Sequence, residues 1–226
     1  MRVLLSVLCA LFMSTAAHAG ALDLLSGSQA TGGLKQALEQ GANVAVDQLG
    51  RKGGFLNDAK VRIPLPKALE KTRPILQMMG KGDELDDLQT AMNRAAEAAV
   101  PEARSLLVNA VKQMSVDDAK QILSGGDDSV TRYFESKTRS VLSERFLPVV
   151  SAQTGRLSLA GQYNKVAGQA AQAGLLKGEE TSVETFVTAK ALDGLYATIA
   201  EQERQIRANP MQAAGDLAKK VFGALK

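Results

Sequence analysis

Two short stretches of the sequence carry polar residues at spacings that can bring them together on one face of a helix. In the first stretch, Asn93, Glu97 and Pro101 follow one another at intervals of four residues. Arg94 stands three residues before Glu97. Because residues three and four apart are neighbours on a helix, an amide, a carboxylate and a guanidinium would lie side by side. Such a group fits a buried polar cluster, structural or ligand-binding, and it equally fits a solvated surface ion pair.

The second stretch is TAKALDGLY, residues 188–196. Lys190 and Asp193 form an i, i+3 pair beside an apolar stripe, and Gly194 stands in the middle of the expected helix. Glycine there costs about 1 kcal/mol relative to alanine, so we expect another backbone or a ligand to come close. We predict that the polar face of the first stretch turns toward this helix, with Gly194 giving the clearance.

The fragment TRYF adds another cation and a phenol, next to a phenylalanine that we expect in the core. Arg132 has the charge to pair with a carboxylate of either stretch, as Lys190 does, but no spacing in the sequence connects them. Helix packing, surface ion pairs and a ligand site therefore all remain as interpretations. The candidate ligand-binding residues are Asn93, Arg94, Glu97, Arg132, Tyr133, Lys190 and Asp193.

Few catalytic chemistries fit the composition. The single cysteine, Cys9, and the single histidine, His18, both lie in an N-terminal segment that we expect to be removed. The mature chain then has no thiol nucleophile, no imidazole base and no soft metal ligand, and it has no glycine-rich phosphate-binding motif. We assign no catalytic residue, no cofactor and no metal. The catalytic alternative is a carboxylate-dependent hydrolase or lyase that uses Glu97 and Asp193.

The first residues have the pattern of a secretory signal peptide. Arg2 precedes an apolar run over residues 3–13, and residues 17–19 offer the small-x-small site that signal peptidase accepts. The run is too short to span a membrane. We predict cleavage near Ala19, followed by a flexible lead-in over residues 20–32.

The elements that must position these residues are helices. Apolar residues recur at helical spacing, alanine and leucine are abundant, and Trp is absent, which predicts one all-α domain over residues 33–226, a compact bundle of about eight helices. We expect kinks at Pro101 and Pro148, because proline removes a helical hydrogen bond. The expected helices cover 33–49, 66–79, 83–114, 115–123 with Ser115 as cap, 128–152, 157–173, 181–208 and 210–224. The segment VRIPLPKAL is expected to be extended, as an apolar strap over the bundle.

Three blocks of the sequence together resemble a known family. They are GFLNDAKVRIPLPKAL, MNRAAEAAVPEARSLLVNAVKQMSVDDAKQILSGGDDSVTRYF and VTAKALDGLYATIAEQERQIRANP. The chain resembles the exported bacterial proteins of the domain of unknown function DUF4197, from about residue 30 to residue 223. The resemblance implies a periplasmic protein of a Gram-negative cell, and it implies no activity and no catalytic residues.

The hypothesis that follows is a non-enzymatic binding protein of the cell envelope. Its partner would be another protein, or an apolar small molecule held between helices. No dense run of Lys and Arg is present, so we expect no nucleic acid. The C-terminal segment, residues 210–226, carries an apolar face beside lysines, which fits peripheral membrane contact or, more often, closure of the bundle.

Overall fold

Residues 27–212 and 215–223 are described in a computed structural model, and among them every regular element is a helix. This confirms the predicted all-α class. The α-helices are α2 (Gly27–Gly50), α3 (Lys67–Glu70), α4 (Arg73–Met78), α5 (Gly82–Ala99), α6 (Ala103–Gln113), α7 (Val116–Ser124), α8 (Ser129–Thr154), α9 (Ser158–Gln172), α10 (Val183–Ala208) and α11 (Asp216–Gly223). The 3₁₀ turns are η1 (Val100–Glu102), η2 (Gly178–Thr181) and η3 (Pro210–Gln212).

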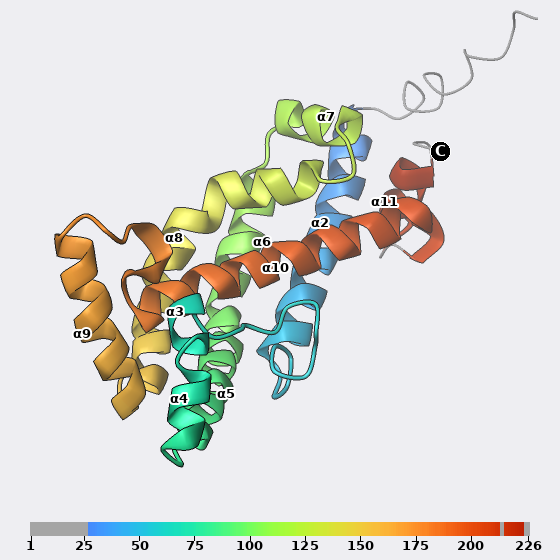
Figure 1. Ribbon diagram of the computed structural model, residues 1–226. Coiled ribbons are helices and arrows are strands. Elements are labelled where there is room, and N and C mark those ends of the chain that lie inside the picture. The colour runs from blue at the N-terminus through green and yellow to red at the C-terminus, as the bar shows by residue number, and fades with distance from the viewer. Residues whose placement is uncertain (1–26, 213–214, 224–226) are drawn as a thin grey trace, which may run out of the picture.

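The long helices form the centre of the bundle. Helices α8 and α10 run side by side through the middle of the molecule, α2 packs against α10, and α5 packs against α8 (Figure 1). Their buried faces share one continuous hydrophobic cluster, which extends along the chain from Leu34 to Phe222. Small residues such as Ala45 and Ala96 are fully buried on the facing surfaces, so the helices can approach closely.

Helix α2 begins earlier than expected. The sequence pattern predicted a helix over 33–49, whereas the helix starts at Gly27, inside the segment expected to be a flexible lead-in. Gly33 lies where α11 crosses α2, because a Cβ built there would come within 2.5 Å of the Leu217 carbonyl oxygen. The first turns of α2 are therefore in contact with α11. The predicted signal peptide, residues 1–19, lies outside the described residues.

The helix expected over 83–114 is interrupted at Pro101. Helix α5 ends at Ala99, a 3₁₀ turn spans Val100–Glu102, and α6 continues from Ala103. The predicted kink is thus a short 3₁₀ turn between two α-helices. At the second proline, Pro148, α8 continues without a break.

Two further expected helices are divided. The segment 66–79 forms α3 and α4, because Pro74 lacks an N–H donor and is favoured in the first turn of a new helix. The segment 210–224 forms η3 and α11, with Gly215 before α11 at φ +82°, a conformation that favours glycine. By contrast, α7 has the predicted Ser115 capping box, and α9 lies within one residue of the predicted range.

Candidate functional site

Residues 51–66 connect α2 to α3 and are held by α5. This segment contains the first six residues of the predicted strap, 61–66, whose last three residues lie in α3. We call residues 51–66 the strap from here on. Asn93 of α5 holds the strap with both groups of its side-chain amide. Its Oδ1 accepts a hydrogen bond from the Ile63 N–H at 2.8 Å, and its Nδ2 donates to the Ile63 carbonyl at 2.9 Å. This pair of bonds imitates the pairing of two antiparallel strands. Ile63 is available for such pairing because Pro64 keeps it extended.

Glu97, one helical turn further along α5, binds the other half of the strap. Its Oε1 accepts hydrogen bonds from the N–H groups of Phe55 at 3.2 Å and Leu56 at 3.1 Å. Its Oε2 accepts from the Gly53 N–H at 3.0 Å and from the Arg94 guanidinium at 2.6 Å. The buried carboxylate therefore has four donors, three of them main-chain amides of one loop.

The surroundings of Glu97 favour its charged form. Burial by itself raises the pKa of the Glu97 carboxyl, but the hydrogen bonds from the Leu56 amide, the Arg94 guanidinium and the other two amides outweigh it, so the pKa lies below its ordinary value. The side chain of Glu97 is 5% exposed and that of Arg94 is 33% exposed. The pair is thus a structural clamp on the strap, and the interpretation as a solvated surface pair is wrong.

The strap also explains Gly194. A Cβ built at Gly194 would lie 2.7 Å from Cε1 of Phe55, whose side chain is fully buried. The clearance at Gly194 is therefore used by a ring of the strap, and not by the backbone of α5 as the sequence suggested. Helices α5 and α10 do contact each other, so the polar face of α5 and the helix of Gly194 meet through this intervening segment.

Pro101 has a similar packing role at the end of α2. Its ring lies against Gly50, where a Cβ would come within 3.2 Å of the proline Cγ and 3.8 Å of the Glu97 carbonyl oxygen. Because proline offers no N–H to that carbonyl, α5 cannot continue with its usual bonding. The resulting 3₁₀ turn packs directly against α2.

Lys190 and Asp193 belong to a second group, on α10. The Asp193 carboxylate receives hydrogen bonds from Arg139 of α8 at 2.6 Å and from Lys190 at 2.9 Å. Lys190 also lies 3.6 Å from a carboxylate oxygen of Glu179. Burial raises the pKa of the Asp193 carboxyl, but the Arg139 and Lys190 hydrogen bonds outweigh it, and the pKa is lowered. Glu97 and Asp193 share no partner, so they form two separate networks.

The TRYF residues join neither network. Arg132 forms an exposed i, i+4 pair with Asp128 at 2.7 Å. The Tyr133 hydroxyl donates to the Ala110 carbonyl at 2.8 Å, which ties α8 to α6. The buried Phe134 packs edge-on beside the tyrosine ring. These contacts are structural, and they leave Arg132 and Tyr133 outside the groups built around the two carboxylates.

A second buried carboxylate, Glu203 of α10, was not predicted from the sequence. Its oxygens accept hydrogen bonds from the N–H groups of Val130 and Thr131, both at 3.3 Å, at the start of α8. Arg207 donates to the same carboxylate at 2.9 Å. Burial raises the pKa of the Glu203 carboxyl, and the hydrogen bonds from Arg207 and the two amides only partly offset this. The sequence did contain a signal for its burial, because Glu203 is a charged residue at a core-facing position of an apolar stripe.

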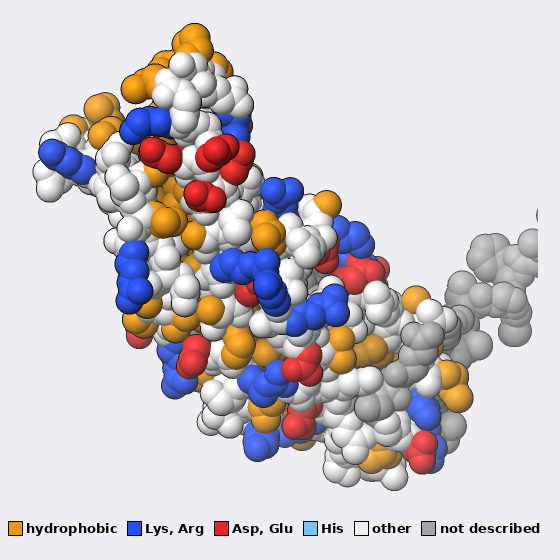
Figure 2. Space-filling model, turned by 90° about the horizontal axis from the view of Figure 1, so that it is seen from below, with side chains coloured by type: hydrophobic (Ala, Val, Ile, Leu, Met, Phe, Trp, Pro, Cys, Tyr) orange, Lys and Arg blue, Asp and Glu red, His pale blue; other side chains and the backbone are white. Residues whose placement is uncertain are grey.

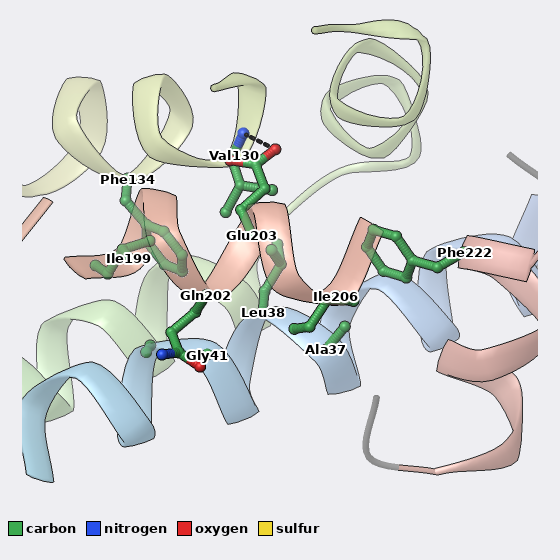
Figure 3. A pocket seen from close by; sticks show the side chains of 11 residues that line it. Ala37, Leu38, Gly41, Val130, Phe134, Ile199, Gln202, Glu203, Ile206 and Phe222 are labelled. Atoms are coloured by element: carbon green, nitrogen blue, oxygen red, sulfur yellow. Dashed lines mark hydrogen bonds between the residues drawn. The ribbon is translucent and has the colours of Figure 1, made fainter. Parts of the chain in front are cut away.

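Glu203 lies beside a small apolar cavity between α2, α8, α10 and α11 (Figure 3). Figure 3 shows Phe134 and Ile199 at one end of the cavity and Phe222 at the other, with the Glu203 carboxylate directed to the Val130 N–H. The cavity measures about 10 Å³, which is the space of roughly one water molecule. An acyl chain does not fit into this space.

The described residues contain no cluster of three or more potential metal ligands. In the same part of the chain, no helix is both long enough and apolar enough to cross a bilayer. The apolar face of α11 is buried in the bundle, with Ala218, Val221 and Phe222 at most 2% exposed. Leu217 of the same helix is partly exposed, and residues 213, 214 and 224–226 of the C-terminal segment lie outside the described residues.

The residues that form this helical bundle, with its strap held by buried carboxamide and carboxylate groups, are also the residues that match one protein family. The model of the family described as "Protein of unknown function (DUF4197)" matches residues 24–223. The chain therefore belongs to the DUF4197 family, as its sequence blocks suggested. No curated protein and no solved structure is significantly similar to it.

Proposed function

We propose that this chain is a non-enzymatic interaction protein of the periplasm that binds a protein partner. The observation that carries the proposal is an unpartnered apolar surface on α4. This helix has no buried residue. Ile75 and Met78 of the helix and Met79 directly after it are exposed, with exposed fractions of 56%, 82% and 63%. Helix α4 and the start of α5 form the lower end of the molecule in Figure 1.

Hydrophobic side chains gather at one projecting end of the molecule in the view from below, and Asp and Glu side chains lie next to them (Figure 2). Methionine is common on surfaces that bind apolar segments of partners, because its side chain adapts to different shapes. An apolar surface of this kind in a soluble protein generally marks an interaction site.

The charges beside this surface indicate which partner it fits. The first two turns of α5 carry four acidic residues, and Asp83, Asp86 and Asp87 are exposed. Asp83 and Asp87 form no ion pair among the described residues, whereas Glu84 and Asp86 are paired with Lys81 and Arg73. The complementary partner is a protein segment with apolar side chains flanked by Lys or Arg.

Two further observations favour a protein partner over the alternatives. The cavity among the core helices is far smaller than the several hundred Å³ of a typical ligand pocket, which weakens the case for an enclosed apolar ligand. The oxygens of Glu97 already receive four hydrogen bonds. A carboxylate so occupied is poorly suited to take a proton from a substrate, which weakens the case for a hydrolase or lyase.

The proposal is tested with two amphipathic helical peptides of equal length, one built of Leu and Lys and the other of Leu and Glu. We expect the Leu/Lys peptide to bind the mature chain in titration calorimetry, and M78S/M79S to weaken binding by about tenfold or more. The control is L175S, because Leu175 has the same exposed fraction as Met78, 82%. Equal binding of both peptides, or an equal effect of both variants, would contradict the proposal.

The location is tested separately. Cell fractionation should recover the chain in the periplasm, and N-terminal sequencing should begin directly after residue 19. A photo-crosslinker at position 78 should then capture one defined protein in cells, and the same group at position 175 should not. Crosslinks to lipid, or to a second copy of the chain, would replace the proposed partner with a membrane or with self-association.

A further inference from the structure

Thr188 of α10 is a buried threonine with an unpaired hydroxyl. Its residue is 2% exposed, and its Oγ1 has no hydrogen-bond partner among the described residues. The other three buried threonines each donate to a carbonyl four residues earlier: Thr138 to Phe134, Thr154 to Val150 and Thr198 to Gly194. Buried polar groups in proteins are nearly always satisfied, so the hydroxyl of Thr188 requires an explanation.

The Thr188 side chain lines a groove between α8 and α10, with η2 at its border. The two helices run antiparallel here, since Arg139 pairs with Asp193 while Thr154 contacts Glu184. The groove is open to solvent and offers about 530 Å³, a volume within the range of small-molecule sites. Rotation about one bond turns a threonine hydroxyl within a helix, so a ligand in the groove can receive the Thr188 hydrogen bond.

The other side chains of the groove define the chemistry of such a ligand. Ser140 and Ser143 of α8 line it and make no side-chain hydrogen bonds to other described residues. Leu147 and Leu192 supply an apolar surface. The groove therefore offers hydroxyl groups together with two aliphatic side chains, a combination that suits a small ligand carrying both hydrogen-bonding groups and short carbon segments.

The charges of the groove favour a cation over an anion. The guanidinium of Arg139 is already bound by Glu135 and Asp193, and it is therefore occupied. Glu144 lines the groove, is exposed, and forms no ion pair within the described part of the chain. Glu179 adds a second carboxylate at the border, 3.6 Å from Lys190. The charge left without a partner in the groove is thus negative.

We propose that this groove binds a small amine-bearing ligand, with its ammonium group at Glu144 and a hydrogen-bonding group at Thr188. An amino sugar and a short lysine-containing peptide share this chemistry. The site lies on α8 and α10, away from the residues of the α4 surface, and it does not depend on that surface. It also lies beside the Asp193 network, which fixes the relative position of the two helices through Arg139.

The test uses the mature chain and four probes. Two carry an amine: glucosamine, and the tripeptide Gly-Lys-Gly with an acetylated N-terminus and an amidated C-terminus. N-acetylglucosamine and the identically capped Gly-Gly-Gly are their neutral counterparts. Binding is followed by amide chemical-shift changes on titration. We expect one of the amine probes to shift residues of the groove, and its neutral counterpart to bind about fivefold or more weakly, as expected for a lost charged contact. The probe that binds identifies the source of the amine.

Two variants connect the binding to the groove. T188V and E144Q should each weaken binding of the amine probe by about five- to tenfold. T198V is the matched control, because Thr198 is a buried threonine of the same helix whose hydroxyl is already bound to Gly194. It should leave binding unchanged. T188V should also keep or raise the melting temperature, since it removes an unpaired buried hydroxyl without creating a cavity.

The outcomes that overturn the proposal are specific. They are the absence of shifts with both amine probes at tens of millimolar, equal binding of amine and neutral probes, or an effect of T198V as large as that of T188V. The double variant M78S/M79S should leave binding of the amine probe intact. If the Leu/Lys peptide does not bind at α4, the proposed amine site in the groove is unaffected. If the amine probe does not bind in the groove, the proposed protein-binding surface on α4 is likewise unaffected.

Discussion

Removal of the Glu97 carboxylate should release the strap and destabilise the whole bundle. Glu97→Ala leaves the amides of Gly53, Phe55 and Leu56 without their acceptor, and it leaves Arg94 without its partner. A buried donor without an acceptor costs about 1–3 kcal/mol, and breaking a buried ion pair costs about 3–5 kcal/mol. Since water will reach some of these groups, we expect the free energy of unfolding to fall by about 3–5 kcal/mol in total. For a chain of this size the melting temperature should fall by about 6–20 °C.

Glu70 provides the matched control. It also forms an i, i+3 pair with an arginine, Arg73, at 2.6 Å, but its side chain is 52% exposed and it accepts no main-chain hydrogen bond from a distant loop. Thermal and urea unfolding of the mature chain, followed by circular dichroism, should show a large loss for Glu97→Ala and a small one for Glu70→Ala. Losses of equal size would refute the reasoning, because they would mean that the buried amides contribute nothing beyond the ion pair.

Three other predictions follow from the described contacts. The pKa of Glu97 is lowered from 4.5 and that of Glu203 is raised from 4.5, so below pH 4.5 wild type should lose its stability advantage over Glu97→Gln. As the pH falls toward 4.5, wild type should instead gain stability relative to Glu203→Gln, because charging Glu203 in the fold is unfavourable. The measurement is urea unfolding as a function of pH. The same pH dependence of the free energy of unfolding in both variants would contradict the opposite pKa shifts of the two carboxyls. Gly194→Ala should destabilise by about 1–3 kcal/mol through overpacking, whereas Gly168→Ala, where a Cβ meets nothing within 4 Å, should stabilise by up to about 1 kcal/mol in thermal unfolding. Ser115→Ala removes the capping box of α7 and should lower the stability of this helix by about 1 kcal/mol. Amide hydrogen exchange in residues 116–124 should then be faster than in wild type, and an unchanged exchange rate would show that packing alone holds this helix.

Local rules in the sequence were sufficient for most of the fold. Helical periodicity located the long helices, and the capping box at Ser115 marked the start of α7. Pro64 and Pro66 indicated an extended strap, because proline keeps the preceding residue out of the helical region. The division of 66–79 was not predicted because Pro74 was not recognised as a helix start, although proline is favoured in the first turn of a helix.

The partners of the polar residues could not be predicted in the same way. The rule-breaking at Pro101 and Gly194 drew attention to Glu97, but the sequence left open whether this carboxylate is buried or solvated. Its main-chain donors, however, lie 41–44 residues earlier in the chain, and a main-chain N–H leaves no mark in the sequence. Arg139 was missed as the partner of Asp193 for a related reason, since any of several cations had a suitable charge and only the packing of α8 on α10 selects one.

The start of α8 has a consequence for the order in which the molecule is completed. The side chain of Asp128, the residue before this helix, accepts no hydrogen bond from the first amides of the helix. Glu203 supplies the acceptor for the Val130 N–H from 73 residues further along the chain. A growing chain therefore lacks this acceptor until residue 203 has been added. Contacts between residues so distant in sequence form slowly, because a long loop must close first. A ribosome that still holds the segment around residue 203 thus also delays the completion of the start of α8.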